Sequence, residues 1–242
     1  MRLTAFKVLT FDCYGTLIDW ESGIFAALQP LLARLPNPPG RDAALEVFAA
    51  HESRQEAATP GMVYSELLAR VHGQLAALWG VAPDPAADAA FGASVPDWPA
   101  FPDSTEALAY LKQHYRLVIL SNVDRASFAA SNRRLEVEFD LICTAQDVGS
   151  YKPDPANFDY LMGKLAGLGF GRADILHTAQ SLFHDHVPAT DAGLACAWID
   201  RRQGVAGWGA TPPPPKEARI AFHFPSMAAL AEAHRAELRA QG

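Results

Sequence analysis

The sequence has little of what marks disulfide-rich, membrane-spanning or nucleic-acid-binding proteins. It contains three cysteines, Cys13, Cys143 and Cys196, and their wide spacing in apolar segments indicates reduced, buried thiols rather than a disulfide framework. No apolar run reaches the ~18 residues of a membrane-spanning helix. Lys and Arg form no cluster and the net charge is −7, which disfavours polyanion binding because such contacts depend on basic side chains. We therefore expect no membrane and no nucleic acid as partners.

The first residues do not resemble a secretory leader. Met1 runs directly into a strand-like segment, without the apolar core of roughly 7–15 residues and the small-residue cleavage site of a signal peptide. We therefore expect a cytoplasmic protein.

The chain does have enough apolar side chains for a large core. Half of its 242 residues are hydrophobic and 19% are charged, as in globular proteins. From residue 18 to residue 99 apolar residues recur at helical spacing, with one stripe from Phe25 to Leu35 and another from Tyr64 to Leu78. No strand pattern interrupts this segment. We predict an all-helical insertion over residues 18–99.

The remaining residues, 1–17 and 100–242, alternate between strand and helix patterns. Near-continuous apolar strands separated by helices indicate a parallel sheet that is covered on both faces. Helices are predicted over Ser104–Tyr115 and Ser226–Ala240, and strands over Phe6–Asp12, Arg116–Ser121, Phe139–Thr144, Ile175–Ala179, Leu194–Ile199 and Ile220–Phe224. The predicted fold class is α/β: a core domain with a doubly wound, Rossmann-like parallel sheet, into which the helical segment is inserted.

An acidic residue, Asp12, stands at the end of the first predicted strand. The carboxyl ends of parallel strands border the ligand crevice of open α/β sheets. Gly15 allows the chain to turn sharply beside the carboxylate, and the Thr16 hydroxyl can hold its second oxygen. Asp12 is therefore a candidate nucleophile.

Polar residues also follow the next three predicted strands. Ser121 and Asn122 offer a hydroxyl and an amide that can hold an anion. Lys152 lies in a proline-flanked turn that would aim its cation inward, and Gln180 and Asp185 follow the fourth strand. Each segment taken alone is also compatible with ordinary turn or surface chemistry.

The sequence contains no pattern of metal ligands. His184, Asp185 and His186 are adjacent and do not share a face, and no further His or Cys cluster supports them. His51 and Glu52 have Gln55 where a zinc-binding helix carries a second His. We therefore predict no metal-ligating residues.

Taken together, the strand-end segments resemble the four motifs of the haloacid dehalogenase-like hydrolases, in order and spacing and over essentially the whole chain. Asp12 and Thr16, within Asp-x-x-Gly-Thr-Leu, are similar to the first motif. Ser121-Asn122 is similar to the second, Lys152 to the third and Asp185 to the fourth. The helical insertion lies where this family carries a cap domain, so the resemblance implies a cap over residues 18–99.

Two substitutions bear on the reaction that this resemblance implies. Phosphatases of the family carry a second Asp where this chain has Tyr14, and an acidic magnesium ligand where it has Gln180. Tyrosine is too weak an acid to replace an aspartic acid as proton donor, and an amide is a poorer ligand for Mg²⁺ than a carboxylate. A halide leaves without protonation, so both losses favour dehalogenation over phosphate ester hydrolysis.

The first motif is most similar to that of the L-2-haloacid dehalogenase branch, which reads Asp-x-Tyr-Gly-Thr-Leu as here. By this resemblance, Asp12 displaces halide from a short 2-haloacid and forms an ester that water then hydrolyses. Lys152 would keep Asp12 ionised, Asp185 would position the water and Thr16 would orient Asp12. The resemblance assigns the substrate, a small-molecule acid, to Tyr14, Ser121, Asn122 and Gln180, with Ser121 and Asn122 holding its carboxylate.

The chain departs from that branch in three places: the cap, the segment after Lys152 and the fourth motif. Its cap arginine has no counterpart in the aligned segment, where Arg54 is a candidate substitute from another turn. Phe158 replaces a Tyr, and Gln180 and Leu182 replace a hydroxyl and an amide. Two alternatives therefore stay open: a magnesium-dependent phosphatase of the same family, and a non-catalytic relative that binds a small acid. We expect no cofactor in the dehalogenase, magnesium in the phosphatase, and a homodimer as one oligomeric state that the family allows.

Overall fold

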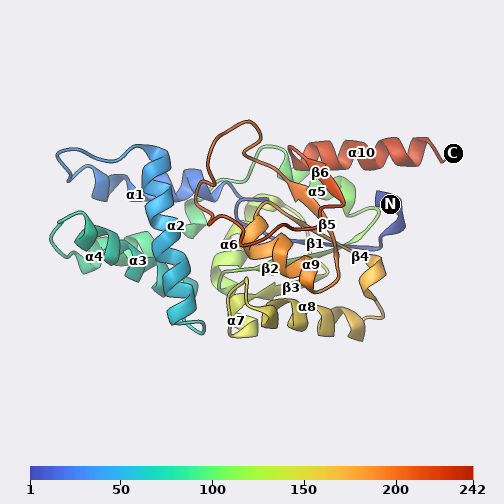
Figure 1. Ribbon diagram of the computed structural model, residues 1–242, viewed down its shortest axis with the longest axis horizontal. Helices are drawn as coiled ribbons and strands as arrows, with labels where there is room; N and C mark the ends of the chain where they lie inside the picture. The colour runs from blue at the N-terminus through green and yellow to red at the C-terminus, as the bar shows by residue number, and fades with distance from the viewer. Residues whose placement is uncertain (242) are drawn as a thin grey trace.

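Six parallel strands form one sheet in the part of the chain that the computed structural model describes, residues 1–241 (Figure 1). The strand order is β3-β2-β1-β4-β5-β6. The strands are β1 (Val8–Phe11), β2 (Arg116–Ser121), β3 (Leu141–Thr144), β4 (Ile175–Ala179), β5 (Ala195–Ile199) and β6 (Phe222–Phe224). The order reverses between β1 and β4, and in open α/β sheets the ligand crevice lies at such a switch point, beyond the carboxyl ends of the strands. The predicted α/β, doubly wound parallel sheet is confirmed.

Helices cover both faces of this sheet (Figure 1). On one face, apolar residues of the sheet pack with those of α5 (Ser104–Leu111), α6 (Arg125–Leu135) and α10 (Met227–Arg239). The opposite face packs against α8 (Pro155–Gly167) and α9 (Val187–Asp191). The shorter elements are η1 (Leu3–Ala5), α7 (Ala145–Val148), η3 (Arg172–Asp174) and the π-helical turn η4 (Leu182–His186).

Side-chain alternation along β1 fixes the direction of the residues that follow it. Val8 lies in the core beneath α8, whereas Leu9 and Phe11 lie in the core on the other face. Because successive side chains of a strand point to opposite faces, Thr10 and Asp12 lie on the side of Val8. Cys13 points the other way and is fully buried in the core that contains Leu9 and Phe11. All three cysteines are free and buried, as predicted.

Several elements are shorter than their sequence patterns, for local reasons. The strand expected from Phe139 begins at Leu141, because the Asp140 carboxylate accepts the Leu117 N–H and caps the ladder. The helix expected to reach Tyr115 ends at Leu111, since the chain beyond it tightens into i→i+3 hydrogen bonds. The strand pattern from Phe6 likewise yields only the four residues of β1.

The segment between β1 and α5 contains helices and no strand in the described chain. Its elements are α1 (Trp20–Leu32), α2 (Arg41–Ala58), α3 (Tyr64–Leu78), α4 (Pro85–Gly92) and the short η2 (Val95–Asp97). The four α-helices lie together at one side of the sheet, in blue to green in Figure 1. The division into a core of residues 1–17 and 100–242 and a cap of residues 18–99 stays a prediction. Within residues 1–241, no helix combines the length and the apolar character needed to cross a membrane.

One arginine, Arg201, binds both connections between the sheet and the helical insertion. Its guanidinium donates to the carbonyl oxygen of Thr16 at 2.8 and 3.1 Å and to the Asp103 carboxylate at 2.8 and 3.0 Å. Between these two points, Ile18 and Ala100 form an isolated antiparallel bridge. The outgoing and returning chains are therefore joined to each other and to the core beside the first strand end.

Candidate active site

The loop after β1 holds Asp12 in a fixed orientation. Gly15 adopts a φ of +90°, which is why the turn needs glycine, and a Cβ there would lie 2.8 Å from the indole nitrogen of Trp20. The Thr16 hydroxyl donates to Asp12 Oδ2 at 2.8 Å and accepts the backbone N–H of Gln180 at 2.9 Å. Asp12 is 5% exposed, so its carboxylate is nearly enclosed but borders a cavity.

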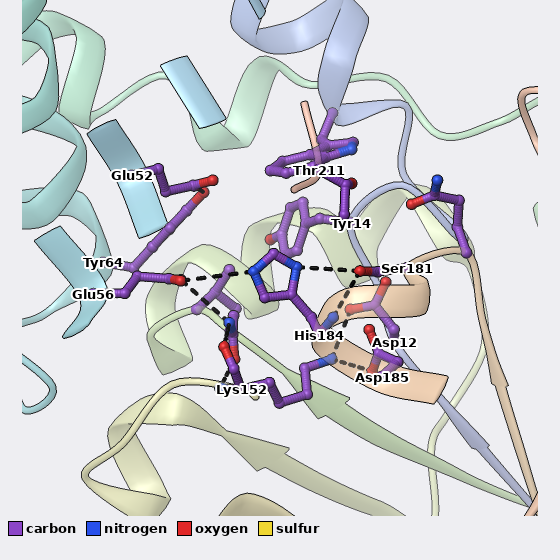
Figure 2. A pocket seen from close by; sticks show the side chains of 14 residues that line it. Asp12, Tyr14, Glu52, Glu56, Tyr64, Lys152, Ser181, His184, Asp185 and Thr211 are labelled. Atoms are coloured by element: carbon purple, nitrogen blue, oxygen red, sulfur yellow. Dashed lines mark hydrogen bonds and ion pairs between the residues drawn. The ribbon is translucent and has the colours of Figure 1, made fainter. Parts of the chain in front are cut away.

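Lys152 joins the carboxylates of two strand ends. Its ammonium donates to Asp12 Oδ1 at 3.0 Å, to Asp185 Oδ1 at 2.6 Å and to the carbonyl oxygen of Leu120 at 2.9 Å. These bonds use all three N–H groups of the ammonium. Figure 2 shows Lys152 reaching across to the paired aspartates from below the cavity. Three residues predicted to act together from separate motifs are thus in direct contact.

Asp185 is held by a second buried chain of hydrogen bonds. Its Oδ1 lies 3.1 Å from His177 Nε2, and His177 Nδ1 lies 2.9 Å from the Thr10 hydroxyl. Asp185 Oδ2 is buried without a hydrogen-bond partner in residues 1–241. One oxygen of Asp185 is therefore fixed by the protein, and the other is left for a water or a ligand.

Asn122 and Ser121 occupy different surroundings, although they are adjacent. The Asn122 amide accepts the Lys152 backbone N–H at 2.6 Å and donates to the Lys152 carbonyl at 2.9 Å. Asn122 borders the cavity, but its amide holds the backbone of Lys152 in place. Ser121 Oγ is buried and unpartnered within the described chain, and Ser121 does not line the cavity. Their contact with a substrate stays a prediction.

Tyr14 and Gln180, the two substituted positions, both line the cavity. The Tyr14 hydroxyl lies 2.8 Å from Ser131 Oγ, and its ring meets Trp98 edge to face at 5.5 Å between centroids. Burial raises the pKa of Tyr14 well above its ordinary value, so this phenol is no stronger a proton donor than free tyrosine. The backbone carbonyl oxygen of Gln180 accepts the indole N–H of Trp198 at 2.9 Å.

The helical insertion contributes an acidic wall, which we define as Glu52 and Glu56 of α2. Figure 2 shows both on the side of the cavity opposite Asp12. The Tyr64 hydroxyl donates to Glu52 Oε1 at 2.7 Å, and the Asn122 amide donates to Glu56 Oε1 at 3.2 Å. Glu52 and Glu56 are 3% and 6% exposed. Neither residue was predicted from the sequence to belong to the site.

A periodic signal for the acidic wall is nonetheless present in the sequence. Leu45, Phe48 and Ala49 of α2 are buried, and Glu52 and Glu56 continue that stripe at helical spacing. Two acids on the buried stripe of a helix need a partner or a function. Arg54, the suggested substitute for a cap arginine, lies instead on the exposed face of α2 and does not line the cavity. That suggestion is wrong, because Arg54 lies outside the buried stripe of α2 that borders the cavity.

His184, in the turn η4, lines the cavity beside the acidic wall. Its Nδ1 lies 3.2 Å from Ser181 Oγ, and its Nε2, 3.9 Å from Glu56 Oε2, is buried without a hydrogen-bond partner in residues 1–241. Burial lowers the pKa of His184 to about 4, so the ring is neutral at pH 7. His186 turns away and contacts the carbonyl oxygen of Ala179 at 2.8 Å. The two histidines around Asp185 therefore do not converge on one point.

Comparison with known proteins identifies the family of this chain. A sequence profile of the haloacid dehalogenase-like hydrolases matches residues 6–177, a span that contains Asp12, Lys152 and the whole helical insertion. The chain belongs to this family. No curated protein sequence matches the chain.

Solved structures show the same fold at low sequence identity. The L-2-haloacid dehalogenase from Xanthobacter autotrophicus matches with a TM-score of 0.76 and 21% identity over 96% of this chain and 99% of that chain. The form of that enzyme with chloropropionic acid covalently bound matches at 0.74 and 20%, over 95% and 98% of the two chains. The HAD-hydrolase YfnB from Bacillus subtilis, bound to magnesium, matches at 0.75 and 18%, over 97% and 100%. The family therefore includes a magnesium-bound protein with this fold.

The side chains of this family member do not form a magnesium site in the arrangement described. Both oxygens of Asp12 accept hydrogen bonds from protein groups, and the Lys152 ammonium lies between Asp12 and Asp185. Gln180 contributes an amide where an acidic ligand is needed. Across residues 1–241, no three His, Cys, Asp or Glu side chains are grouped so that they could hold a metal ion.

The charges of this hydrolase site are set by burial and by Lys152. Burial raises the pKa of Asp12, Lys152 lowers it, and the net effect is upward. For Asp185 burial acts in the same direction, but Lys152 and His177 outweigh it and hold the pKa below its ordinary value. Burial lowers the pKa of Lys152, and the two carboxylates raise it by more. Asp185 and Lys152 thus form an ion pair. Lys152 also offsets part of the effect of burial on the pKa of Asp12.

The acidic wall has the opposite protonation behaviour. Burial raises the pKa of Glu52 to about 8, although the Tyr64 hydroxyl lowers it. Burial and then the neighbouring Glu52 raise the pKa of Glu56 well above its ordinary value. At neutral pH both carboxyl groups are therefore largely protonated and uncharged.

This wall predicts that stability falls as the pH rises. The pKa of Glu52 is about 8 in the folded chain against an ordinary 4.5, so the folded state binds more protons than the unfolded state between these values. The contribution is fully present below pH 4.5 and is lost as the pH rises through 8. We expect the free energy of unfolding to drop by a few kcal/mol, in order of magnitude, between pH 5 and pH 9. Urea denaturation of wild type and Glu52→Gln measures it.

Glu46→Gln, on the exposed face of the same helix, is the matched control. It should retain the wild-type dependence on pH, whereas Glu52→Gln should make the dependence weaker, with Glu56 supplying what remains. Equal slopes for wild type and Glu52→Gln would show that Glu52 ionises normally in the folded protein.

Proposed function

We propose that the protein is a hydrolase that breaks the carbon–halogen bond of a small organohalide through an ester on Asp12. The observation that carries this proposal is the contact between the Lys152 ammonium and Asp12 Oδ1, at 3.0 Å. The ammonium favours the ionised form of the nucleophile. Tyr14 and Gln180 stand where phosphate chemistry needs acidic groups, and halide departure needs neither.

In the first step a carboxylate oxygen of Asp12 attacks the carbon that carries the halogen. The new carbon–oxygen bond forms as the carbon–halogen bond breaks, and the halide leaves with the bonding electron pair. Thr16 and Lys152 fix the plane of the carboxylate, which places its oxygens before the substrate arrives. The Xanthobacter enzyme with covalently bound chloropropionic acid supports an intermediate of this kind.

In the second step water attacks the carbonyl carbon of the Asp12 ester. The ester C–O bond breaks, the alcohol leaves with one proton of the water, and the other proton is released as the Asp12 carboxylate re-forms. Asp185 Oδ2, buried and without a protein partner, is the acceptor that we assign to this water. Lys152 stabilises the negative charge that develops on the former carbonyl oxygen.

The size of the cavity suits a substrate of a few heavy atoms. Its volume is about 40 Å³, and since one water needs roughly 10–15 Å³ of such space, it holds about three waters. A short 2-haloacid, the substrate predicted from the sequence, is compatible with this size. The resemblance assigned the substrate carboxylate to Ser121 and Asn122. The three N–H groups of the Lys152 ammonium are already bound to protein oxygens.

Halide release and isotope labelling test the proposed function. We expect chloride release from L-2-chloropropionate or from 2-chloropropionamide, unchanged by EDTA. In a single turnover with excess protein in H₂¹⁸O, the label is expected in the peptide that contains Asp12, because water attacks the ester at the aspartyl carbon. Hydrolysis of p-nitrophenyl phosphate only with magnesium, and no chloride release, would establish the phosphatase alternative. Inactivity in both assays would leave the non-catalytic relative.

A further inference from the structure

The wall that faces Asp12 is built of carboxyl groups, and we propose that the polar end of the substrate is an uncharged carboxamide rather than a carboxylate. Glu52 and Glu56 would accept the amide N–H groups. The specificity-determining residues are thus Glu52 and Glu56, assisted by His184. This inference rests on the proposed function and names its substrate class, a short 2-haloamide that is converted to a 2-hydroxyamide and halide.

The balance of charge around the cavity disfavours an anionic partner. Four carboxyl groups, of Asp12, Glu52, Glu56 and Asp185, line it, and Lys152 is the one Lys or Arg among its lining residues in the described chain. Each N–H of Lys152 is bound to a protein oxygen. A substrate carboxylate would therefore enter a site that has a surplus of acidic groups and no free cation, and burying a charge without a partner is strongly unfavourable.

A cationic substrate is disfavoured by the protonation of the wall. Burial raises the pKa of Glu52 to about 8, and that of Glu56 also lies well above its ordinary value. Both carboxyls are thus largely neutral at pH 7 and offer carbonyl oxygens rather than a full counter-charge. An uncharged group loses the least on entering such a cavity, because only its hydrogen bonds with water need to be replaced.

An unpartnered side-chain nitrogen points independently to a ligand at the same place. His184 is 8% exposed and lines the cavity, and its Nε2 is buried 3.9 Å from Glu56 Oε2, beyond hydrogen-bond distance. Figure 2 shows the ring between Ser181 and Glu56. In residues 1–241 no side chain satisfies this nitrogen, so its partner is left to a water or a bound ligand. A carboxamide carries a donor and an acceptor, and so matches Nε2 in either neutral tautomer.

A 2-haloamide would undergo the same two steps that are proposed above for the organohalide. Asp12 displaces halide from C2 of the amide, and water hydrolyses the resulting ester at the aspartyl carbon. The adjacent amide carbonyl activates C2 for displacement much as a carboxylate does, without bringing a charge. The product is the 2-hydroxyamide, together with halide and one proton.

Three chloro compounds that differ only at the polar end test this inference at pH 7. They are 2-chloropropionamide, 2-chloropropionate and methyl 2-chloropropionate, each supplied as separate enantiomers, and the measurement is kcat/KM for chloride release. We expect the amide to exceed the acid by at least ~30-fold, since one unpaired buried charge or unmatched hydrogen bond costs about 2 kcal/mol or more. We expect the ester, which lacks N–H donors, to fall below the amide.

Variants of Glu56 test whether the acidic wall causes the preference for the amide over the acid. Glu56→Leu, which removes the acceptor oxygen, is expected to lower the amide-to-acid ratio of kcat/KM about tenfold, and Glu46→Leu, exposed on the same helix, to leave the ratio unchanged. A ratio is insensitive to partial unfolding, which lowers both rates equally. The inference is overturned if the acid is the better substrate, or if ester and amide react equally, while Asp12 still acquires ¹⁸O. No chloride from any compound and no label in Asp12 would overturn the proposed function itself.

Discussion

Replacing Asp12 with asparagine is expected to reduce the rate of halide release by on the order of 10⁴-fold or more, as removal of a catalytic nucleophile does. The amide has the shape of the carboxylate but is a far weaker nucleophile. Chloride release at saturating substrate measures the loss. Mass spectrometry of the protein after a single turnover should show no covalent adduct in the variant.

The same variant should remain folded. Asp12 and Asp185 share one ammonium, so Asp12→Asn leaves a one-to-one pair of Lys152 with Asp185, and we expect stability to change by less than ~2 kcal/mol. Asp159→Asn, exposed on α8, serves as the active control. Appreciable turnover by a folded Asp12→Asn protein would rule out Asp12 as the nucleophile.

Replacing Lys152 with methionine is expected to have the largest effect on stability. Lys152 is 1% exposed, and its removal leaves Asp12 and Asp185 buried without a counter-ion. Breaking one side of a buried ion pair costs about 3–5 kcal/mol. We also expect turnover to fall by at least ~10³-fold, because the developing negative charge loses its stabilising cation. Urea denaturation and chloride release measure the two effects.

The pH dependence separates the loss of charge from a packing defect. Without Lys152 the pKa values of the Asp12 and Asp185 carboxyls should rise. The loss of stability in Lys152→Met should therefore be smallest at pH 5 and largest at pH 8. The control is Lys7→Met, which removes the partner of Asp174 at the surface. The Lys7 side chain is 66% exposed, so this change should lower the free energy of unfolding by less than about 1 kcal/mol. A deficit for Lys152→Met that is the same at both pH values would indicate lost packing instead of an unpaired charge.

The places of the strands along the chain were largely predictable from the sequence, because they depend on local apolar patterns. Apolar runs such as Arg116–Ser121 and Ile175–Ala179 match β2 and β4 residue for residue. Element ends were less predictable, since they depend on single hydrogen bonds. The Asp140 carboxylate, which delays the start of β3, carries no signal of its own in the sequence.

The half of the site that lies on the sheet was predictable for the same reason. Parallel strands end at one edge, so Asp12, Lys152 and Asp185 had to meet if the strands were correctly identified. The half that comes from the insertion was not. Glu52 and Glu56 reach the cavity only because α2 docks across it, and their helical spacing shows burial without showing what they face.

Side-chain direction was the other limit of the sequence. Asn122 was predicted to hold a substrate, but nothing in the sequence indicated that its amide binds both backbone polar groups of Lys152. His177 was absent from the candidate residues because it lies in the middle of an apolar strand, yet it holds Asp185 from below. An interior histidine of this kind is distinguished from a core residue only by its partner across the strands.

The position of Arg201 determines which part of the protein can open for substrate. A cavity with room for about three waters, enclosed by α2 on one side, has to widen when a substrate enters or a product leaves. The guanidinium fastens Thr16 and Asp103 to the core, and the Ile18–Ala100 bridge ties the two chain segments to each other. A swinging motion of the helices that keeps these contacts therefore pivots beyond that bridge, so Asp12 and the Thr16 hydroxyl stay in place while Glu52 and Glu56 move away from them.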